Sequence, residues 1–225
     1  TTEIYTLSLH DALPIYDINQ IPLQKGKDYY KELFEIGDLF IANSNFTKTQ
    51  MITLGCPENR IVVIPVGLHI KDFPYKERKY PSAGPVRILT IGRLVEKKGH
   101  KYSILAIARL IKEGFDIHYT IAGTGILKSE LENLVSKLNI AENITFTGEI
   151  TQQEAINLYN ESHLFVLSSI TASNGDKEGQ GLVLQEAQAC GLPVVSTLHN
   201  GIPDGVLNGQ SGFLVPEKDI ESLAD

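Results

Sequence analysis

The stretch Asp176–Gly191, D-K-E-G-Q-G-L-V-L-Q-E-A-Q-A-C-G, decides the fold, because a glycine-rich turn leads there into an apolar helical segment. A predicted strand, His163–Ser168, precedes it, and a second one, Pro193–Thr197, follows it. In parallel α/β sheets, this order of strand, glycine turn, helix and strand creates a binding site for a phosphorylated ligand at the helix N-terminus. Free backbone N–H groups and the positive end of the helix dipole both favour an anion at that place.

Alternating strands and helices extend from this stretch toward the N-terminus. Short loops join them, which is typical of a parallel, doubly wound sheet. We therefore predict an α/β fold with a Rossmann-like domain. The predicted strands are Val86–Ile91, Ile117–Ala122 and Ile144–Thr147, and the predicted helices are Tyr102–Lys112, Leu127–Leu138 and Gln152–Glu161.

A separate β-α-β unit precedes this domain. Its predicted strands are Asp38–Ala42 and Ile61–Pro65, and the helix Phe46–Leu54 joins them. Ser44 and Asn45 are of the residue types that cap the start of a helix. The unit is too small to bury its own faces, so we expect it to dock onto something larger.

A further helix is predicted over Asp28–Ile36, on the N-terminal side of this unit. Tyr29, Leu33 and Ile36 recur there at helical spacing, so we expect them to form its apolar face. Gly37 is expected to end the helix.

The segment Lys71–Pro85 is predicted to be a linker, since it is rich in proline, lysine and tyrosine and has no apolar period. We place a domain boundary near Gly84. Residues 17–83 are then the remnant of a first domain with the linker, and residues 84–225 are a second, ligand-binding domain.

Both ends of the chain depart from the pattern of a complete domain. Thr1–Tyr16 lacks the basic start and the cleavage site of a signal peptide, and it resembles translated read-through of a sequencing adapter. We expect this segment to be non-native or disordered. Ile220–Asp225 reads as a helix interrupted in mid-pattern, so we expect a truncation there as well.

The composition is that of a soluble globular protein, with 42% hydrophobic and 21% charged residues. The formal net charge of −7 argues against a nucleic-acid binder, which normally carries a basic face. Cys56 and Cys190 make neither a disulfide framework nor a metal-ligand set, so we expect buried thiols and a reducing, cytoplasmic compartment. No apolar run approaches the roughly 20 residues of a membrane-spanning helix.

A basic loop follows the predicted strand Val86–Ile91. It contains Gly92 and Arg93, and Lys98 comes five residues after Arg93. Arginine forks onto two phosphate oxygens and lysine supplies a compact charge, so the two together suit a diphosphate. If this loop stood alone, an ordinary solvated surface would be the simpler interpretation.

Glycine turns end the next two predicted strands. Gly123 and Gly125 follow one strand, and Gly148 ends the other, with Ile150 two residues further on. Each turn alone indicates only a tight change of direction. The chain has neither the full G-x-G-x-x-G dinucleotide fingerprint nor the G-x-x-x-x-G-K-[ST] phosphate loop.

Two glutamates stand eight residues apart in the first stretch. Glu178 falls in the loop and can point into a ligand crevice, whereas Glu186 lies about one turn into the helix. A carboxylate can accept two hydrogen bonds from a vicinal diol, as acidic residues do with ribose. Each glutamate alone fits a loop residue or a helix start favoured by the dipole. Together with the glycines and the basic loop, they favour a ligand site.

Metal and covalent chemistry lack support in the sequence. No acidic triplet suggests a Mg²⁺ site, and no G-x-S-x-G turn or cysteine–histidine pattern indicates a covalent hydrolase. The residues therefore indicate neither a metal site nor covalent catalysis. The following histidines have no spacing typical of a metal site: His69, His100, His118, His163 and His199.

Five motifs occur together in an order known from one protein family. They are G-R-L-V-E-K-K-G (Gly92–Gly99), I-A-G-T-G (Ile121–Gly125), F-T-G (Phe146–Gly148), E-G-Q-G-L-V-L-Q-E-A (Glu178–Ala187) and G-L-P-V-V-S-T (Gly191–Thr197). The chain from about Asp17 to Asp225 resembles the carboxyl-terminal, donor-binding part of family 4 retaining glycosyltransferases, which have the GT-B fold. The runs Thr171–Gly179 and His199–Asp204 are most similar to bacterial exopolysaccharide and colanic-acid-type transferases.

The resemblance implies transfer of a hexose, with retention, from a UDP- or GDP-sugar to a saccharide or lipid-linked acceptor in bacterial surface polysaccharide synthesis. Arg93 and Lys98 would bind the diphosphate in place of a metal ion, so neither a metal nor a cofactor would be required, and Glu178 would contact the donor sugar. These three residues would form the catalytic set, and Glu186 would hold the ribose. Further contacts to the nucleotide would come from Gly92, Gly123, Gly148, Ile150, Gly179, Gly181, Leu182 and Val183.

The resemblance is incomplete on the amino-terminal side. The family has a His-Gly pair before Y-D-I, whereas Pro14 and Ile15 precede Tyr16 here. Most of the acceptor-binding domain is absent, so we expect a fragment that binds the donor and turns over poorly. Gln180 replaces an aromatic or aliphatic residue and is expected to change the packing of the turn. We expect a cytoplasmic protein, with peripheral membrane contact made through the missing domain.

Three other functions stay open. A non-catalytic nucleotide-sugar-binding module would share the same donor site. A hydrolysing sugar-nucleotide epimerase of the GT-B fold would release UDP and sugar without an acceptor. A flavodoxin-like signalling domain would need a phosphorylatable aspartate in an acidic pocket at a strand end, and none stands out.

Overall fold

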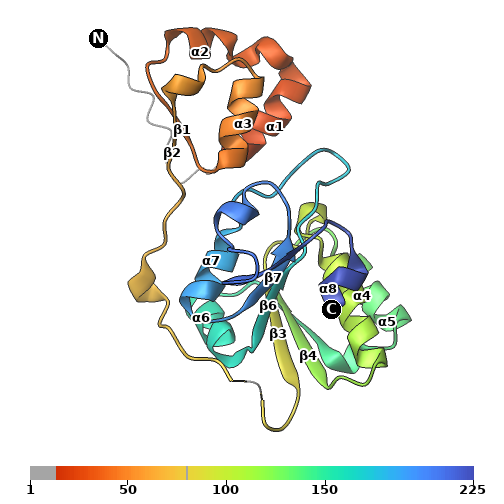
Figure 1. Cartoon of the computed structure of the whole chain (residues 1–225). Coiled ribbons are helices and arrows are strands. Elements are labelled where there is room, and N and C mark those ends of the chain that lie inside the picture. Colours follow the sequence, from red (N-terminus) through yellow and green to blue (C-terminus); the bar gives the residue numbers. More distant parts are fainter. Residues whose placement is uncertain (1–13, 80) are drawn as a thin grey trace.

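The computed structural model describes residues 14–79 and 81–225, which form a small N-terminal unit and a larger α/β domain (Figure 1). Residues 1–13 of the segment expected to be non-native lie outside the described residues. Its last three residues, Pro14, Ile15 and Tyr16, begin α1. In the N-terminal unit, two short strands pair in parallel with a helix between them. Its elements are α1 (Pro14–Lys25), α2 (Lys31–Ile36), β1 (Phe40–Ala42), α3 (Asn45–Thr53) and β2 (Ile61–Val63).

The larger domain is built on a parallel sheet. Its strands are β3 (Val86–Ile91), β4 (Ile117–Ala122), β5 (Ile144–Gly148), β6 (Leu164–Leu167), β7 (Val194–Thr197) and β8 (Gly212–Val215). They lie in the order β5-β4-β3-β6-β7-β8, and every neighbouring pair is parallel. Counted from β3, this is the strand order of the Rossmann fold, in which the winding reverses between β3 and β6. The predicted α/β class and Rossmann-like sheet are confirmed.

Helices cover both faces of this sheet (Figure 1). Because successive strand residues face opposite sides, Ile88 of β3 packs into one apolar core and Leu89 into the other. Leu127, Leu131 and Val135 recur at helical spacing in the predicted helix Leu127–Leu138, and this stripe lies in the first core. On that face lie α4 (His100–Lys112), α5 (Lys128–Lys137) and α8 (Ile220–Ala224), and on the other lie α6 (Gln152–Glu161) and α7 (Leu182–Ala189).

The predicted apolar face of the first helix was wrong. Tyr29, Leu33 and Ile36 are exposed, whereas Phe34 is buried. The segment starts as a 3-10 turn, Lys27–Tyr30, before α2 begins. A 3-10 turn has 3.0 residues per turn, so the angular phase of the side chains shifts relative to a continuous α-helix.

Strand β8 was missed in the sequence analysis. It has only four residues and lies at the edge of the sheet. Phe213 faces outward and is exposed, while Leu214 is buried in the core. So short a strand, with one clear inward residue, gives too little alternation to be recognised.

The predicted linker runs along the larger domain. Phe73 is buried in the core that contains α7. The Arg78 guanidinium donates to the Cys190 carbonyl oxygen at 2.6 Å, and Lys76 N–H donates to the same oxygen at 3.2 Å. A Cβ atom on Gly191 would lie 2.4 Å from the Lys76 carbonyl oxygen, so this approach requires glycine. The linker is therefore fixed to the domain by the buried Phe73 side chain and by contacts to the backbone of Cys190 and Gly191.

Candidate active site

The carboxyl ends of β3 and β6 meet where the sheet reverses its winding. The loops that follow these strands touch, since Ser168 Oγ donates to the Gly99 carbonyl oxygen at 2.8 Å. Gly99 has a φ of 66°, and a Cβ atom there would lie 1.8 Å from the Ser168 carbonyl oxygen. Only glycine permits this approach, and open α/β sheets bind ligands in the crevice at such a reversal.

Glycine turns lie side by side along the same edge. Gly123 N–H donates to the Gly148 carbonyl oxygen at 2.8 Å. A Cβ atom on Gly123 would lie 2.1 Å from the Gly92 carbonyl oxygen, and one on Gly125 would lie 2.4 Å from that of Leu94. The glycines expected to contact a nucleotide therefore also allow the three loops to approach one another.

Lys98 and Glu178 form an ion pair in the crevice, between Lys98 Nζ and Glu178 Oε2, and each side chain is only 13% exposed. Glu178 Oε1 accepts a hydrogen bond from Gly179 N–H at 3.1 Å. Burial raises the pKa of Glu178, but the charges of Lys98 and Lys97 and the hydrogen bonds outweigh it and hold the pKa below its ordinary value. The carboxylate is therefore charged at neutral pH.

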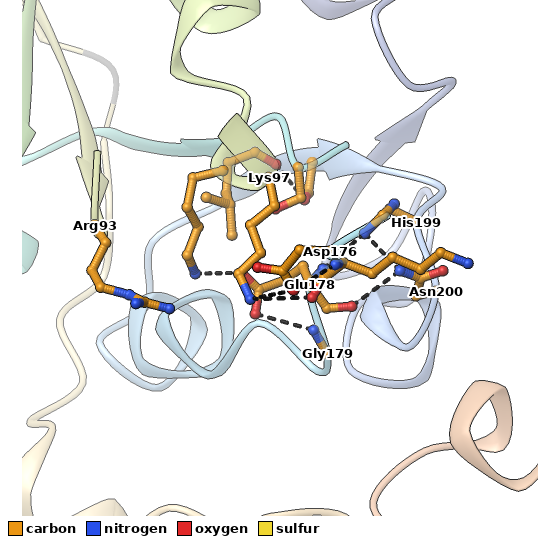
Figure 2. Close-up of polar contacts among 12 residues, drawn as sticks. Arg93, Lys97, Asp176, Glu178, Gly179, His199 and Asn200 are labelled. Atoms are coloured by element: carbon orange, nitrogen blue, oxygen red, sulfur yellow. Dashed lines mark hydrogen bonds and ion pairs between the residues drawn. The ribbon is translucent and has the colours of Figure 1, made fainter. Parts of the chain in front are cut away.

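A second ion pair joins the same two loops. Lys97 Nζ lies 3.1 Å from Asp176 Oδ1 and 3.3 Å from the Lys177 carbonyl oxygen. Figure 2 shows Lys97, Asp176 and Glu178 gathered in one cluster. Two adjacent lysines of the β3–α4 loop thus pair with two acids of the β6–α7 loop.

Arg93 lies at the side of this cluster. Its side chain is exposed, and Figure 2 shows it apart from the contacts around Glu178. The Arg93 guanidinium makes no ion pair with any residue that the structure describes, so it is available to an anionic ligand. The Arg93 carbonyl oxygen contacts His100 Nε2 at 3.0 Å. Burial lowers the pKa of His100 to about 4, so this neutral ring donates the hydrogen bond and fixes the loop.

The backbone of Glu178 is held from the loop that follows β7. Glu178 N–H donates to His199 Nε2 at 3.0 Å, and Asn200 Nδ2 donates to the Glu178 carbonyl oxygen at 3.1 Å. Asn200 has a φ of 46°, in the left-handed region that asparagine adopts more readily than most residues. Figure 2 shows His199 and Asn200 on the side of Glu178 opposite Arg93.

Glu186 lies one turn inside α7, which begins at Leu182 after the left-handed Gly181. The Tyr159 hydroxyl, from α6, donates to Glu186 Oε2 at 2.7 Å. Burial and the Glu186 carboxylate raise the pKa of Tyr159, so the hydroxyl stays protonated. The N–H groups of Leu182 and Val183 occupy the first positions of the helix, where no intrahelical acceptor exists. This end of α7 therefore suits an anion.

The turn before α7 also contacts the segment that leads out of the N-terminal unit. Gln180 is buried, its Oε1 accepts from Val66 N–H at 2.9 Å, and its Nε2 donates to the Val66 carbonyl oxygen at 3.1 Å. The side chain of Gln180 thus joins the turn to Val66 by two hydrogen bonds, where the family often has an aromatic or aliphatic side chain.

The N-terminal unit docks through the start of α3. Asn45 N–H donates to Asp204 Oδ2 at 2.6 Å, and Asn45 Nδ2 donates to Asp204 Oδ1 at 3.2 Å. A carboxylate at this end of a helix is favoured by the dipole. Gly201 lies so close that a Cβ atom would be 2.8 Å from Ser44 Cβ. The loop that contains His199 therefore contacts both the crevice and the N-terminal unit.

The structure brings some of the predicted residues together and separates others. Lys98, Glu178 and Gly179 share one set of contacts, with Arg93 beside them, and Gly181, Leu182 and Val183 follow in the same turn. Gly92, Gly123 and Gly148 lie at adjacent strand ends, and the half-buried Ile150 follows them. Missed by the sequence analysis were Lys97, Tyr159, Asp176, His199, Asn200 and Glu217. Asp176, His199 and Asn200 lie in the runs Thr171–Gly179 and His199–Asp204, and Lys97 lies in G-R-L-V-E-K-K-G, whereas no quoted motif contains Tyr159 or Glu217.

The described residues contain neither a metal-binding cluster nor a membrane-spanning helix. Within residues 14–79 and 81–225, no group of three or more His, Cys, Asp or Glu side chains is placed to hold a metal ion. Among the same residues, no helix has both the length and the apolar character that crossing a membrane requires.

Comparison with known sequences gives relatives that are longer than this chain. The putative colanic acid biosynthesis glycosyltransferase WcaL of Salmonella typhimurium is 36% identical over 195 residues, which cover 87% of this chain and 48% of that protein. The amylovoran biosynthesis glycosyltransferase AmsK of Erwinia amylovora is 36% identical over 202 residues, covering 90% and 49%. The chain thus spans about half the length of the curated relatives it matches.

Solved structures share the fold. The crystal structure of Anabaena HepE in complex with UDP has a TM-score of 0.73 at 24% identity, over 86% of this chain and 54% of that one. The complex of the same protein with UDP-glucose has a TM-score of 0.71 at 23% identity, over 90% and 57%. These neighbours confirm the predicted GT-B type of fold. The sequence profile described as Glycosyl transferases group 1 matches residues 73–225, more than half of the chain, and the chain therefore belongs to that family.

Proposed function

We propose that this chain is the donor-binding part of a family 4 retaining glycosyltransferase. The whole enzyme would transfer a hexose from a nucleotide-diphosphate sugar to a saccharide or lipid-linked acceptor in bacterial surface polysaccharide synthesis. The names of WcaL and AmsK, which refer to colanic acid and amylovoran biosynthesis, support this kind of product. The complexes of Anabaena HepE with UDP and with UDP-glucose support the class of donor.

The observation that carries the proposal is the meeting of Lys98, Glu178 and the start of α7 where the sheet reverses. A lysine and a helix N-terminus both favour a diphosphate, and a charged carboxylate beside them suits the hydroxyl groups of a sugar. Negative charge builds up on the diphosphate as the sugar leaves it. Lys98 and the exposed Arg93 would stabilise that charge as fixed positive groups.

The two glutamates would hold the two ends of the donor. Glu178 would accept hydrogen bonds from the sugar, and Glu186 would accept them from the ribose diol. Tyr159 donates to Oε2 of Glu186, so Oε1 would be the oxygen that accepts from the ribose. The glycine turns at Gly92, Gly123 and Gly148, with Ile150, would line the nucleotide.

Arg93 and Lys98 would take the place of a divalent cation, so the proposed reaction needs no metal and no other cofactor. The proposed location is cytoplasmic, peripheral on the membrane face where a lipid-linked acceptor would lie. Two buried, unpaired thiols, Cys56 and Cys190, are compatible with a reducing compartment.

Calorimetric titration of the purified chain with UDP-, GDP- and ADP-sugars tests the proposal. We expect saturable binding of one class of nucleotide, weakened about 10-fold or more in the control variant Glu186→Ala, since hydrogen bonds to charged groups contribute about 1.5–3 kcal/mol. If the chain binds none of the three classes of nucleotide sugar, the proposal is contradicted. Release of nucleotide and free sugar without an acceptor would instead identify a hydrolysing epimerase.

We also propose that this chain alone transfers sugar poorly, because it spans only about half the length of its relatives. An assay with acceptor and the 225-residue chain checks this. Robust transfer would contradict it. Activity of the full-length parent separates an enzyme from a non-catalytic binding module.

A further inference from the structure

One buried histidine holds the loop that carries Glu178. His199 lies in the loop after β7, and its side chain is 0% exposed. Such a ring has to use its polar atoms inside the protein, because an unpaired buried polar group is costly. Both ring nitrogens of His199 have partners, and those partners come from different loops.

The hydrogen bonds fix the protonation of this ring. Glu178 N–H lies 3.0 Å from His199 Nε2, and Asn200 Nδ2 lies 2.7 Å from the same atom. Both of these groups are donors only, so Nε2 must present its lone pair. The proton therefore sits on Nδ1, which donates to Glu217 Oε1 at 2.5 Å.

Glu217 is fixed in turn by the backbone. Its Oε2 accepts a hydrogen bond from Thr171 N–H at 2.8 Å. Burial raises the pKa of Glu217, but the hydrogen bonds from His199 and Thr171 outweigh it, so the pKa lies below its ordinary value. A charged carboxylate therefore orients the imidazole, and the imidazole accepts from the backbone of Glu178. This chain of contacts runs from the end of β8 to the crevice.

We propose that His199 is a positioning residue for the donor sugar. Its neutral ring, oriented by Glu217, fixes the backbone of Glu178 so that the carboxylate of Glu178 faces the sugar. This inference rests on the proposed function, because it requires that Glu178 contact the sugar. A proton on Nε2 would place a donor opposite the two donors of Glu178 and Asn200, and the loop would be released.

The contacts predict a pH dependence with a definite sign. The titratable groups that face His199 are Glu217 from the segment after β8, and Glu178 and Lys177 from the β6–α7 loop. Burial lowers the pKa of His199 from 6.5, while the two carboxylates oppose this and Lys177 adds to it. Because the folded pKa is lowered, the stabilising neutral form is fully present above 6.5 and is lost as the pH falls through the folded pKa.

The first test separates positioning from general support of the fold. The probe is whichever of UDP-glucose, GDP-mannose and ADP-glucose binds the wild-type chain best, with its matching nucleoside diphosphate. In His199→Leu we expect the nucleotide sugar to bind about 10-fold more weakly and the nucleoside diphosphate to change by less than about 3-fold. His199→Gln, whose Oε1 can accept in place of Nε2, should recover the affinity to within about 3-fold. His69→Gln, at an exposed histidine, is the control.

The outcomes of this test distinguish failure of the inference from failure of the proposed function. If His199→Leu lowers the affinity for both ligands equally, His199 has a merely structural role and the inference is overturned. Unchanged binding of the nucleotide sugar would overturn it as well. If the wild-type chain binds neither ligand, the proposed function fails and the inference with it. If the wild-type chain binds both ligands and the variants match it, only the inference fails.

A second measurement begins with the wild-type chain. Long-range ¹H–¹⁵N NMR spectra of the wild-type chain at about pH 7.5 report which ring nitrogen carries the proton. We expect His199 to be neutral with its proton on Nδ1. We also expect the preference for nucleotide sugar over nucleoside diphosphate to fall as the pH drops through the pKa of His199 in the folded chain, which lies below 6.5, and to stay constant in His199→Gln. A proton on Nε2 at about pH 7.5, or a pH-independent preference in the wild type, would overturn the inference.

Discussion

Glu178 and Glu186 belong to the same stretch of sequence, yet the molecule holds them in different ways. Glu178 lies in a loop, where Lys98 pairs with its carboxylate and His199 accepts from its backbone. Glu186 lies on α7, and its side chain accepts a hydrogen bond from Tyr159. The first position depends on contacts between distant segments, whereas the second follows from the hydrogen-bonded backbone of a helix.

This difference separates stability from affinity. Removing a partner of Glu178 leaves a buried charge uncompensated and loosens a loop, so the free energy of unfolding should fall. Removing the Glu186 carboxylate leaves the helix in place, so the main loss should be in ligand binding. Four experiments test this contrast, from the largest expected effect to the smallest.

Lys98→Met should have the largest effect. It removes one partner of a buried ion pair, a change that costs about 3–5 kcal/mol in the free energy of unfolding. We expect about 3 kcal/mol, because each side chain of the pair keeps some exposure and Lys97 lies nearby. Urea denaturation measures the loss.

The matched control is Lys101→Met, at an exposed position of α4, which should change the free energy of unfolding by less than about 0.5 kcal/mol. The double variant Lys98→Met/Glu178→Gln should recover part of the loss, since it leaves no unpaired charge. Equal stability of Lys98→Met and its control would contradict the importance of the pair.

Glu186→Ala should act mainly on the ligand. We expect nucleoside diphosphate and nucleotide sugar to bind about 10- to 100-fold more weakly, because charged hydrogen bonds contribute about 1.5–3 kcal/mol. Stability should change by only about 1 kcal/mol, since Tyr159 keeps a longer contact to the Val183 carbonyl oxygen at 3.4 Å. Calorimetry and urea denaturation measure the two quantities. A loss of stability as large as that of Lys98→Met would remove the contrast between the two glutamates.

Tyr159→Phe should have a smaller effect on the same end of the site. It removes the hydroxyl that orients Glu186 at 2.7 Å and leaves the packing of the ring in place. We expect a loss of affinity for the nucleoside diphosphate of about 5-fold, which corresponds to about 1 kcal/mol. Calorimetry measures it, and unchanged affinity would show that Glu186 does not need this partner.

Metal removal should have the smallest effect. If Arg93 and Lys98 stabilise the diphosphate, excess EDTA should change the affinity for the nucleotide sugar by less than about 2-fold. Titration of the wild-type chain with and without EDTA and Mg²⁺ measures this. A strict requirement for Mg²⁺ would contradict the proposed role of the two cations.

Much of the fold could be predicted from local pattern. The stripe of Leu127, Leu131 and Val135 marks α5 because its period is that of a helix. The capping box of Thr151 and Glu154 and the N-cap at Ser44 set the starts of α6 and α3, as their residue types indicate. These features depend on neighbours in the sequence, which is why a single sequence reveals them.

The contacts that hold the site residues in place could not be predicted, because they join residues far apart in the chain. His199 contacts Glu178 from 21 positions away, and Lys97 contacts Asp176 from 79 positions away. No periodicity signals such pairs. The spacing of Glu178 and Glu186 was visible in the sequence, but the different ways in which they are held are properties of the tertiary structure.

The most direct test of the proposed donor site is a crystal structure of this chain with a bound nucleotide sugar. We expect the Glu178 carboxylate within about 3 Å of a sugar hydroxyl, Glu186 at a similar distance from the ribose diol, and the diphosphate between Lys98 and the start of α7. A nucleotide sugar bound elsewhere, or a sugar that makes no contact with Glu178, would contradict the assignment of the two glutamates to the two ends of the donor.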